Sequence, residues 1–189
     1  MKKLNVFQRN DLKKGATNKI RREGNVPGVV YGRGQSNEMI YVNGDELKAI
    51  LRNLKSGLLA TTLFELHEGK KTFRAIVKDI HYHAVSYAIQ HIDFLAVDDA
   101  KPVNVNVPIQ IVGAADCAGV KLGGFVRQVI RSLEVNCLAK DIPTEFTLDV
   151  RDLNISESKR LSDIAMPASV RPNGRMNEVA VVIAKGKAA

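Results

Sequence analysis

The stretch VPGVVYGRGQSNEMIYVN, residues 26–43, holds two short runs rich in β-branched and aromatic residues on either side of a glycine-containing segment. Such runs, bounded by turn-forming residues, are typical of neighbouring β-strands. We therefore expect strands at 26–32 and 39–43. Asn43 is also a favourable helix N-cap, and Glu46 stands three residues later, as in a capping box. A helix should follow the second strand directly.

Alternating apolar residues and turn signals extend this pattern in both directions along the chain. Leu4, Val6 and Gln8 alternate as in a first strand, and a short helix over 15–23 is followed by the stop signal Gly24. Further strands are expected at 59–67, 72–82, 87–97, 103–112, 125–131, 133–139, 145–150 and 178–184. The predicted fold class is mostly β with short helices (α+β), mainly antiparallel, with barrel closure favoured over a parallel sheet.

Positive charge is concentrated at the start of the chain. The first 33 residues hold nine Lys or Arg and two Asp or Glu, a net charge of +7, against +8 for all 189 residues. Charge that served only general solubility would be spread over the sequence. This concentration instead indicates one surface that meets a polyanion.

The composition changes near residue 97. Residues 1–97 carry sixteen basic and nine acidic residues, a net charge of +7, whereas residues 98–189 carry twelve and eleven, a net charge of +1. The segment DDAKP, residues 98–102, is short, acidic and closed by proline, as a linker would be. We predict two domains, 1–97 and 98–189.

Several functional classes have no support in the sequence. No apolar run approaches the ~20 residues that a membrane helix needs, and the basic N-terminus lacks the apolar block of a secretory signal. Cys117 and Cys137 have no metal-ligand spacing, so we expect two reduced thiols in the cytoplasm. A nucleophile elbow, a phosphate loop and a metalloprotease motif are all missing from the sequence, so we expect no catalytic residues and no cofactor.

Five basic residues lie in the helix expected at 15–23 or shortly before it: Arg9, Lys14, Lys19, Arg21 and Arg22. On a helix, Lys19 and Arg22 lie three residues apart on one face, with Arg21 at a neighbouring position. Forked guanidinium contacts and ammonium charge together suit phosphate oxygens. The alternative is an ordinary solvated helix face, but the concentration of charge favours polyanion binding.

Three further side chains are candidates for contacts to nucleotides. Tyr31 ends an expected strand beside the basic group, and it offers a ring and a hydroxyl; a half-buried barrel tyrosine is the alternative. On the strand at 87–97, His91 and Asp93 share one face while Ile92 and Phe94 share the other. The polar pair could bond 2′-hydroxyls and base edges, or the carboxylate could orient the imidazole. An ordinary polar strand face is again the alternative.

A metal site is a competing interpretation of the histidines. His81 and His83 share a strand face, and His91 with Asp93 could complete four ligands. The His-x-His spacing is common, and no recognisable second half of a metal motif accompanies it. A metal-dependent enzyme that uses these four residues therefore remains an alternative hypothesis.

Four segments of the chain resemble a known family. RREGNVPGVVYGRG (21–34) and QHIDFLAV (90–97) are similar to the signature blocks of bacterial large-subunit ribosomal protein twenty-five. GVKLGGFVRQVIRSLEVNCLAKDIP (119–143) and TEFTLDVRDL (144–153) are similar to the extra domain of its long form, the general stress protein Ctc. The order and spacing of these blocks extend the resemblance over almost the whole chain. NISESKRLSDIAMP (154–167) departs from the glycine-acidic turn that the family usually has there.

The resemblance implies a structural protein that binds 5S ribosomal RNA in the central protuberance of the large subunit. Its N-terminal domain would be a small β-barrel with helices that grips the loop E region through the minor groove, followed by a second β-rich domain. The family's RNA-contacting positions correspond here to Arg9, Arg21, Arg22, Tyr31, His91 and Asp93, with Lys14 and Lys19 where basic residues are common. Asn18 stands where some members carry an arginine.

The partners expected from this resemblance are 5S ribosomal RNA and neighbouring large-subunit proteins. The protein would be monomeric off the ribosome, with no membrane and no small-molecule substrate among its partners. A stress-response protein that acts away from the ribosome is the third hypothesis. The resemblance does not indicate what the second domain contacts.

Overall fold

The computed structural model describes residues 2–9, 11, 13–32, 37–55, 57–69 and 71–185. The chain divides into two compact units, Met1–Val103 and Asn104–Ala189, each with its own hydrophobic core. This division lies six residues after the boundary that we predicted from composition, between residues 97 and 98. The glycine-containing segment between the strands predicted at 26–32 and 39–43 falls largely outside the described residues.

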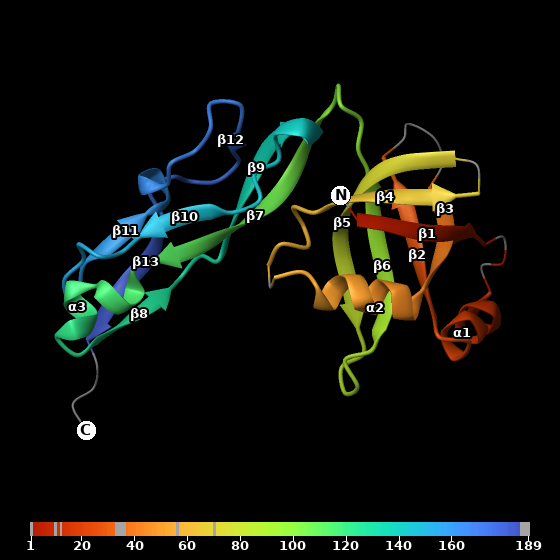
Figure 1. The fold of residues 1–189 in the computed structure, drawn as a ribbon, viewed down its shortest axis with the longest axis horizontal. Coiled ribbons are helices and arrows are strands. Elements are labelled where there is room, and N and C mark those ends of the chain that lie inside the picture. Colours follow the sequence, from red (N-terminus) through yellow and green to blue (C-terminus); the bar gives the residue numbers. More distant parts are fainter. Residues whose placement is uncertain are drawn as a thin grey trace. The chain divides into compact units, whose positions relative to one another are not determined.

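Unit 1 is a closed barrel in which six strands follow the order β1-β3-β2-β6-β5-β4 (Figure 1). The strands are β1 (Lys2–Gln8), β2 (Asn25–Tyr31), β3 (Glu38–Asn43), β4 (Leu63–Glu68), β5 (Lys71–Tyr82) and β6 (Ile89–Ala96). Most neighbours are antiparallel, but β1 pairs with β4 and β2 pairs with β6 in parallel. The predicted barrel and the mostly β fold class are confirmed.

Alternation along the strands fills the barrel interior. Leu4 and Val6 of β1 and Ile92 and Phe94 of β6 are buried, while the residues between them are less covered. Phe94 meets Phe64 edge to face, with ring centroids 6.1 Å apart. The two rings occupy the centre of the core, where aromatic pairs add stability beyond their buried area.

Two helices of nine residues lie on the barrel, α1 (Lys14–Arg22) and α2 (Gly44–Arg52). The predicted cap of α2 is confirmed: the Asn43 side chain accepts hydrogen bonds from the backbone N–H groups of Asp45 and Glu46 at 2.9 and 3.2 Å. Helix α1 is followed by Gly24 at φ +82° and has no fully buried residue, so its basic side chains remain at the surface. Among the described helices, none has the length and hydropathy that crossing a membrane requires.

The strand expected at 59–67 begins later, at Leu63, because a turn precedes it. The hydroxyls of Thr61 and Thr62 both donate to the Leu58 carbonyl, at 3.1 and 2.6 Å, and hold this segment in a turn. Local side-chain bonds of this kind compete with strand pairing. The first residues of the predicted strand therefore form a turn instead.

Unit 2 contains two sheets, in the orders β10-β7-β9-β12 and β11-β13-β8. Its elements are β7 (Pro102–Val112), α3 (Ala118–Lys121), β8 (Gly124–Gln128), β9 (Ser132–Leu138), β10 (Phe146–Asp149), β11 (Ser158–Arg160), β12 (Arg171–Pro172) and β13 (Val179–Lys185), with short 3-10 turns at 114–116, 139–141 and 161–163. Both sheets contribute to one core, which includes Val135 and Ile183. Cys117 and Cys137 are buried in it and form no disulfide with one another. The sequence pattern did not predict α3, β11 or β12.

The segment that departs from the family pattern forms a tight turn at 154–157. The backbone N–H of Glu157 donates to the Asn154 carbonyl at 3.2 Å, and Ser156 adopts a φ of +70°. This conformation favours glycine, because a Cβ atom is crowded there. Serine is thus an unfavourable residue at the position where a glycine fits best.

Ser156→Gly is expected to stabilise unit 2 by about 0.5–1 kcal/mol, since relief of backbone strain outweighs the larger chain entropy of glycine. The midpoint of thermal unfolding of this unit should rise by a few degrees. Ser158→Gly, in the strand that follows, is the matched control and should be destabilising. Equal effects of the two substitutions would contradict the account of the turn.

Candidate nucleic-acid interface

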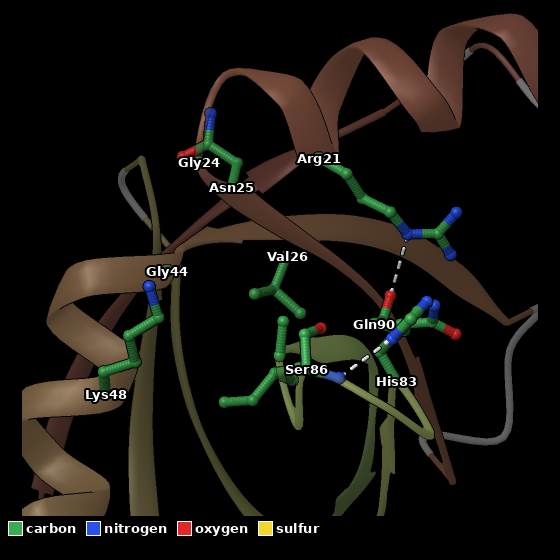
Figure 2. Close-up of a pocket in the computed structure, with 11 residues that line it drawn as sticks. Arg21, Gly24, Asn25, Val26, Gly44, Lys48, His83, Ser86 and Gln90 are labelled. Carbon is green, nitrogen blue, oxygen red and sulfur yellow. Dashed lines mark hydrogen bonds between the residues drawn. The ribbon is translucent and has the colours of Figure 1, made fainter.

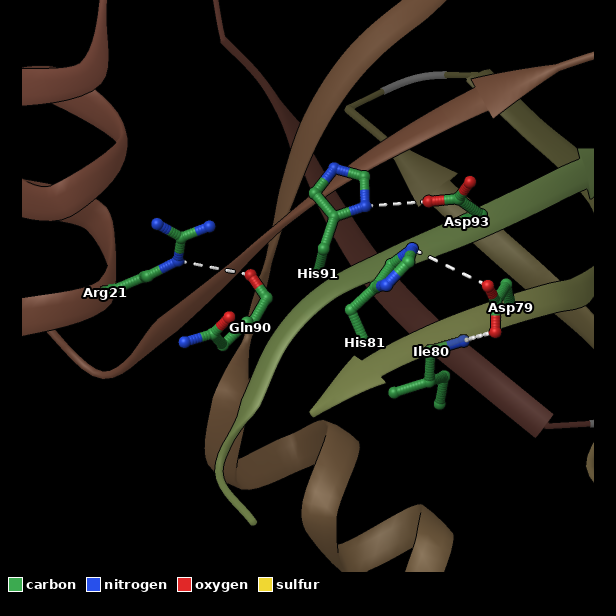
Figure 3. A network of polar contacts seen from close by, with 7 residues as sticks. All are labelled: Arg21, Asp79, Ile80, His81, Gln90, His91 and Asp93. Atoms are coloured by element: carbon green, nitrogen blue, oxygen red, sulfur yellow. Dashed lines mark hydrogen bonds and ion pairs between the residues drawn. The ribbon is translucent and has the colours of Figure 1, made fainter. Parts of the chain in front are cut away.

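Helix α1 is joined to strand β6 by one arginine. The Arg21 Nε–H donates to the Gln90 carbonyl at 3.2 Å (Figure 3). Its Nη1 donates to the Asn18 side-chain oxygen at 3.3 Å. The contact with Gln90 holds the guanidinium beside the start of β6, one residue before His91, and the contact with Asn18 holds it from within α1. Asn18 therefore positions Arg21, a role that the sequence alone did not suggest.

His91 and Asp93 form a hydrogen-bonded pair on the outer face of β6. Their side chains share this face, and the His91 Nδ1 atom lies 2.7 Å from Asp93 Oδ1 (Figure 3). Ile92 and Phe94 point into the core, so the predicted alternation is confirmed. Because a carboxylate accepts hydrogen bonds, Nδ1 carries the proton and Nε2 is left to face a ligand.

A second His–Asp pair lies opposite the first on β5. The antiparallel register places Asp79 across from Asp93 and His81 across from His91. His81 Nε2 lies 3.5 Å from Asp79 Oδ2, and the two imidazole rings are 6.1 Å apart. Sequence reasoning missed Asp79, because the register that places it across from Asp93 depends on an irregularity near Lys78 that has no local signal.

Tyr31 ends β2, the strand that runs parallel to β6 on its other side. Val29 is in register with Asp93, and Tyr31 lies two residues further along β2, in register with Leu95. Burial raises the pKa of the Tyr31 hydroxyl, and the nearby carboxylates of Asp93 and Asp79 raise it further. The phenol therefore stays protonated and remains a hydrogen-bond donor at neutral and moderately alkaline pH.

Arg9 follows β1 and is fixed at both its backbone and its side chain. Its N–H donates to the Met39 carbonyl at 2.9 Å, and Nη1 donates to the Thr17 hydroxyl of α1 at 3.2 Å. Burial lowers the pKa of Arg9, and the positive charge of Arg21 lowers it further. The buried Nε atom has no partner among the described residues. Two guanidinium groups are thus held close together, and a phosphate would relieve their repulsion.

The three remaining basic candidates lie on the exposed part of α1. Lys14 begins the helix, and Lys19 forms a long ion pair of 3.9 Å with Glu23. Within the described part of the chain, the Arg22 guanidinium makes no side-chain hydrogen bond or ion pair. These side chains keep most of their rotational freedom and can reach an approaching polyanion.

Of the four residues of the metal hypothesis, His81, His91 and Asp93 lie near one another, but His83 does not join them. His83 lies in the β5–β6 turn, where its Nδ1 atom accepts from the backbone N–H groups of Val85 and Ser86 at 3.3 and 3.2 Å. Across the described ranges of the chain, no group of three or more His, Cys, Asp or Glu residues is arranged to hold a metal ion. The arrangement of His83 therefore gives no support to a four-ligand site made of these residues.

Two family models match the chain, one for each unit. The model of the Ribosomal L25p family matches residues 4–94, and that of the Ribosomal protein TL5, C-terminal domain, matches residues 102–187. The large ribosomal subunit protein bL25 of Chlamydia abortus is 43% identical over 182 residues, covering 96% of this chain and 98% of that protein. The bL25 proteins of Chlamydia trachomatis serovar L2 (strain 434/Bu) and Chlamydia pneumoniae are 42% and 41% identical, with the same coverage.

Proposed function

This chain belongs to the ribosomal L25p family of large-subunit proteins, and we propose that it binds 5S ribosomal RNA in the central protuberance. A structural role in the ribosome, with ribosomal RNA binding, follows from the family. The proposal concerns which RNA is bound and which face of the barrel binds it. The observation that carries it is the chain of contacts and charge interactions that links Arg9, Arg21, Tyr31 and the His91–Asp93 pair along helix α1 and strands β2 and β6.

The chemistry of this face suits the minor groove of an RNA helix. A-form RNA has a deep, narrow major groove, whereas its shallow minor groove displays base edges and 2′-hydroxyls. A protein that binds there needs cations for the two backbones and neutral or mixed donors and acceptors between them. The loop E region of 5S RNA is the target that the family resemblance implies.

Each side chain has a role that fits its position. Arg9 and Arg21 are held in fixed orientations and would bind phosphates at defined places, while Lys14, Lys19 and Arg22 would add mobile positive charge from α1. The Tyr31 hydroxyl would donate to a sugar or base oxygen. His91, oriented by Asp93, would present Nε2 to a 2′-hydroxyl.

Unit 2 would contribute little to RNA affinity, because residues 98–189 carry a net charge of only +1. We propose that it contacts neighbouring ribosomal proteins. The protein would act on the large subunit in the cytoplasm, without catalysis. A role away from the ribosome predicts instead that the protein stays in the light fractions when cell extract is sedimented.

Arg22→Ala is expected to weaken binding to 5S RNA by ~1–3 kcal/mol, because a charge-assisted contact to phosphate is lost. Arg22 has no other partner among the described residues, so the fold should not change. Arg127→Ala, which removes the same charge from an exposed position of β8, is the control and should have almost no effect. Affinities are measured by filter binding at one fixed salt concentration. Equal losses for both variants would mean diffuse attraction and no defined site.

A further inference from the structure

The β5–β6 turn, residues 83–88, presents large side chains to solvent. Tyr82, the last residue before the turn, and Tyr87 are 51% and 78% exposed, and they are two of the four tyrosines in a chain without tryptophan. Both residues line one hollow, and large apolar groups exposed together are a feature of binding surfaces. The face of the barrel described above does not include either ring.

Hydrogen bonds hold this turn in one conformation. The backbone N–H of His83 donates to the Ala88 carbonyl at 2.8 Å, and that of Tyr87 donates to the His83 carbonyl at 2.9 Å. The His83 imidazole accepts from two further backbone N–H groups of the turn. Tyr87 has a φ of +53°, a conformation that is unfavourable for an aromatic residue. The Tyr87 ring is therefore exposed on a strained backbone. Backbone strain of this kind is found more often at functional sites than elsewhere.

Two hollows border the turn, and both are lined in part by Lys48 of α2. The larger, about 510 Å³, is lined by Tyr82, Tyr87 and the end of α2 at Arg52. The smaller, about 210 Å³, extends to Arg21 and Gln90 (Figure 2). The turn is thus continuous with the face that we propose for RNA.

The charges around these hollows are of one sign. Lys48, Arg52 and Arg21 are basic, and none of the described residues that line either hollow is acidic. Asp45 lies nearby and contacts Lys48 Nζ at 3.4 Å, so this lysine is held in place but only partly neutralised. Flat rings combined with basic side chains match a nucleotide, because the base can stack and the phosphate can meet a cation.

We propose that the β5–β6 turn and the end of α2 bind one unpaired nucleotide of the same RNA, with the base against Tyr82 and Tyr87 and the phosphate at Lys48 and Arg52. This inference rests on the proposed RNA-binding function and extends its surface beyond the helical groove. Unpaired bases are accessible to such stacking in RNA, whereas bases inside a helix are not. The turn would thereby distinguish a folded RNA with a looped-out base from a plain duplex.

The test compares the full chain with a Tyr82→Ala/Tyr87→Asn double variant. Asparagine tolerates a positive φ, so the variant should fold and melt at or above the temperature of the wild type. Its affinity for full-length 5S RNA should fall by about 5- to 20-fold, within the range for loss of base stacking. Its affinity for a fully base-paired fragment of the same RNA should not change. Tyr87→Phe, which keeps the ring, and Val85→Ala, at another exposed position of the turn, should bind the full RNA within twofold of wild type.

The outcomes separate this inference from the proposed function. If Arg22→Ala weakens binding but the double variant binds full-length 5S RNA like wild type, the turn does not hold a nucleotide, although the proposed function stands. Normal RNA binding combined with failure to enter large subunits would mean that the turn contacts a protein, which also overturns the inference. If the wild-type protein binds neither RNA, the proposed function is wrong, and the inference that rests on it falls with it.

Discussion

Phe94→Ala is expected to unfold unit 1 while leaving unit 2 folded. Phe94 is fully buried and contacts Phe64 edge to face in the centre of the barrel. Loss of a buried phenylalanine costs about 3–5 kcal/mol, because the apolar contacts disappear and a cavity remains. The whole stability of a domain is only about 5–15 kcal/mol, so the barrel of the variant should be largely unfolded at a moderately raised temperature.

The two cysteines make this prediction measurable. Both thiols lie in the core of unit 2, so their reaction with an alkylating reagent reports on that unit alone. Burial raises the pKa of Cys137, with a contribution from Asp141, which slows its reaction further in the native state. In the Phe94→Ala protein, circular dichroism should show loss of the barrel at a temperature where neither thiol reacts.

Phe7→Ala is the matched control. Phe7 is half exposed and stacks on Tyr41 at the surface of the barrel, with ring centroids 5.3 Å apart. Its loss should cost about 1 kcal/mol or less, because little buried area and no cavity are involved. If the thiols of Phe94→Ala become reactive together with the loss of the barrel, the two units unfold as one, and our prediction of two domains is wrong.

The barrel was predictable because its local signals agree with one another. Alternation placed Leu4 and Val6 inside β1, and it separated Ile92 and Phe94 from His91 and Asp93 on β6. Asn43 marked the start of α2 because its side chain satisfies backbone N–H groups that have no other partner. Each of these patterns depends only on neighbours in sequence.

What the sequence could not reveal depends on contacts between distant residues. Arg21 meets the Gln90 carbonyl sixty-nine residues away, and the register that pairs Asp79 with Asp93 depends on an irregularity near Lys78. The short strands β11 and β12 have no alternation of their own, so they exist only because β13 and β9 pair with them. The parallel closure of the barrel likewise has no local signature.

Asp93→Asn is expected to weaken binding to 5S RNA by ~1–3 kcal/mol, although it removes a negative charge from the RNA-facing surface. The reason is that Asp93 Oδ1 accepts from His91 Nδ1 at 2.7 Å and so fixes the orientation and the tautomer of the ring. An amide can present its NH₂ group there instead, which would leave the proton of the ring on the other nitrogen. Simple electrostatics predicts the opposite result, tighter binding.

Asp79→Asn provides the matched control, because Asp79 lies directly across from Asp93 and its contact with His81 is longer, at 3.5 Å. The same charge is removed from almost the same place, so its affinity should stay equal to that of the wild type or rise slightly. Loss of affinity in both variants would mean that both His–Asp pairs orient groups toward the RNA. Tighter binding by both variants would show that Asp93 makes no favourable contribution to RNA binding.

The salt dependence of binding separates orientation from charge. A carboxylate releases no counterions from RNA, so Asp93→Asn should lower the affinity at every salt concentration and leave the log–log slope almost unchanged. Arg21→Ala should make that slope shallower by about one, since one phosphate contact is lost. If Asp93→Asn changes the slope as much as Arg21→Ala does, its effect is electrostatic, and the orientation of His91 is not what the RNA requires.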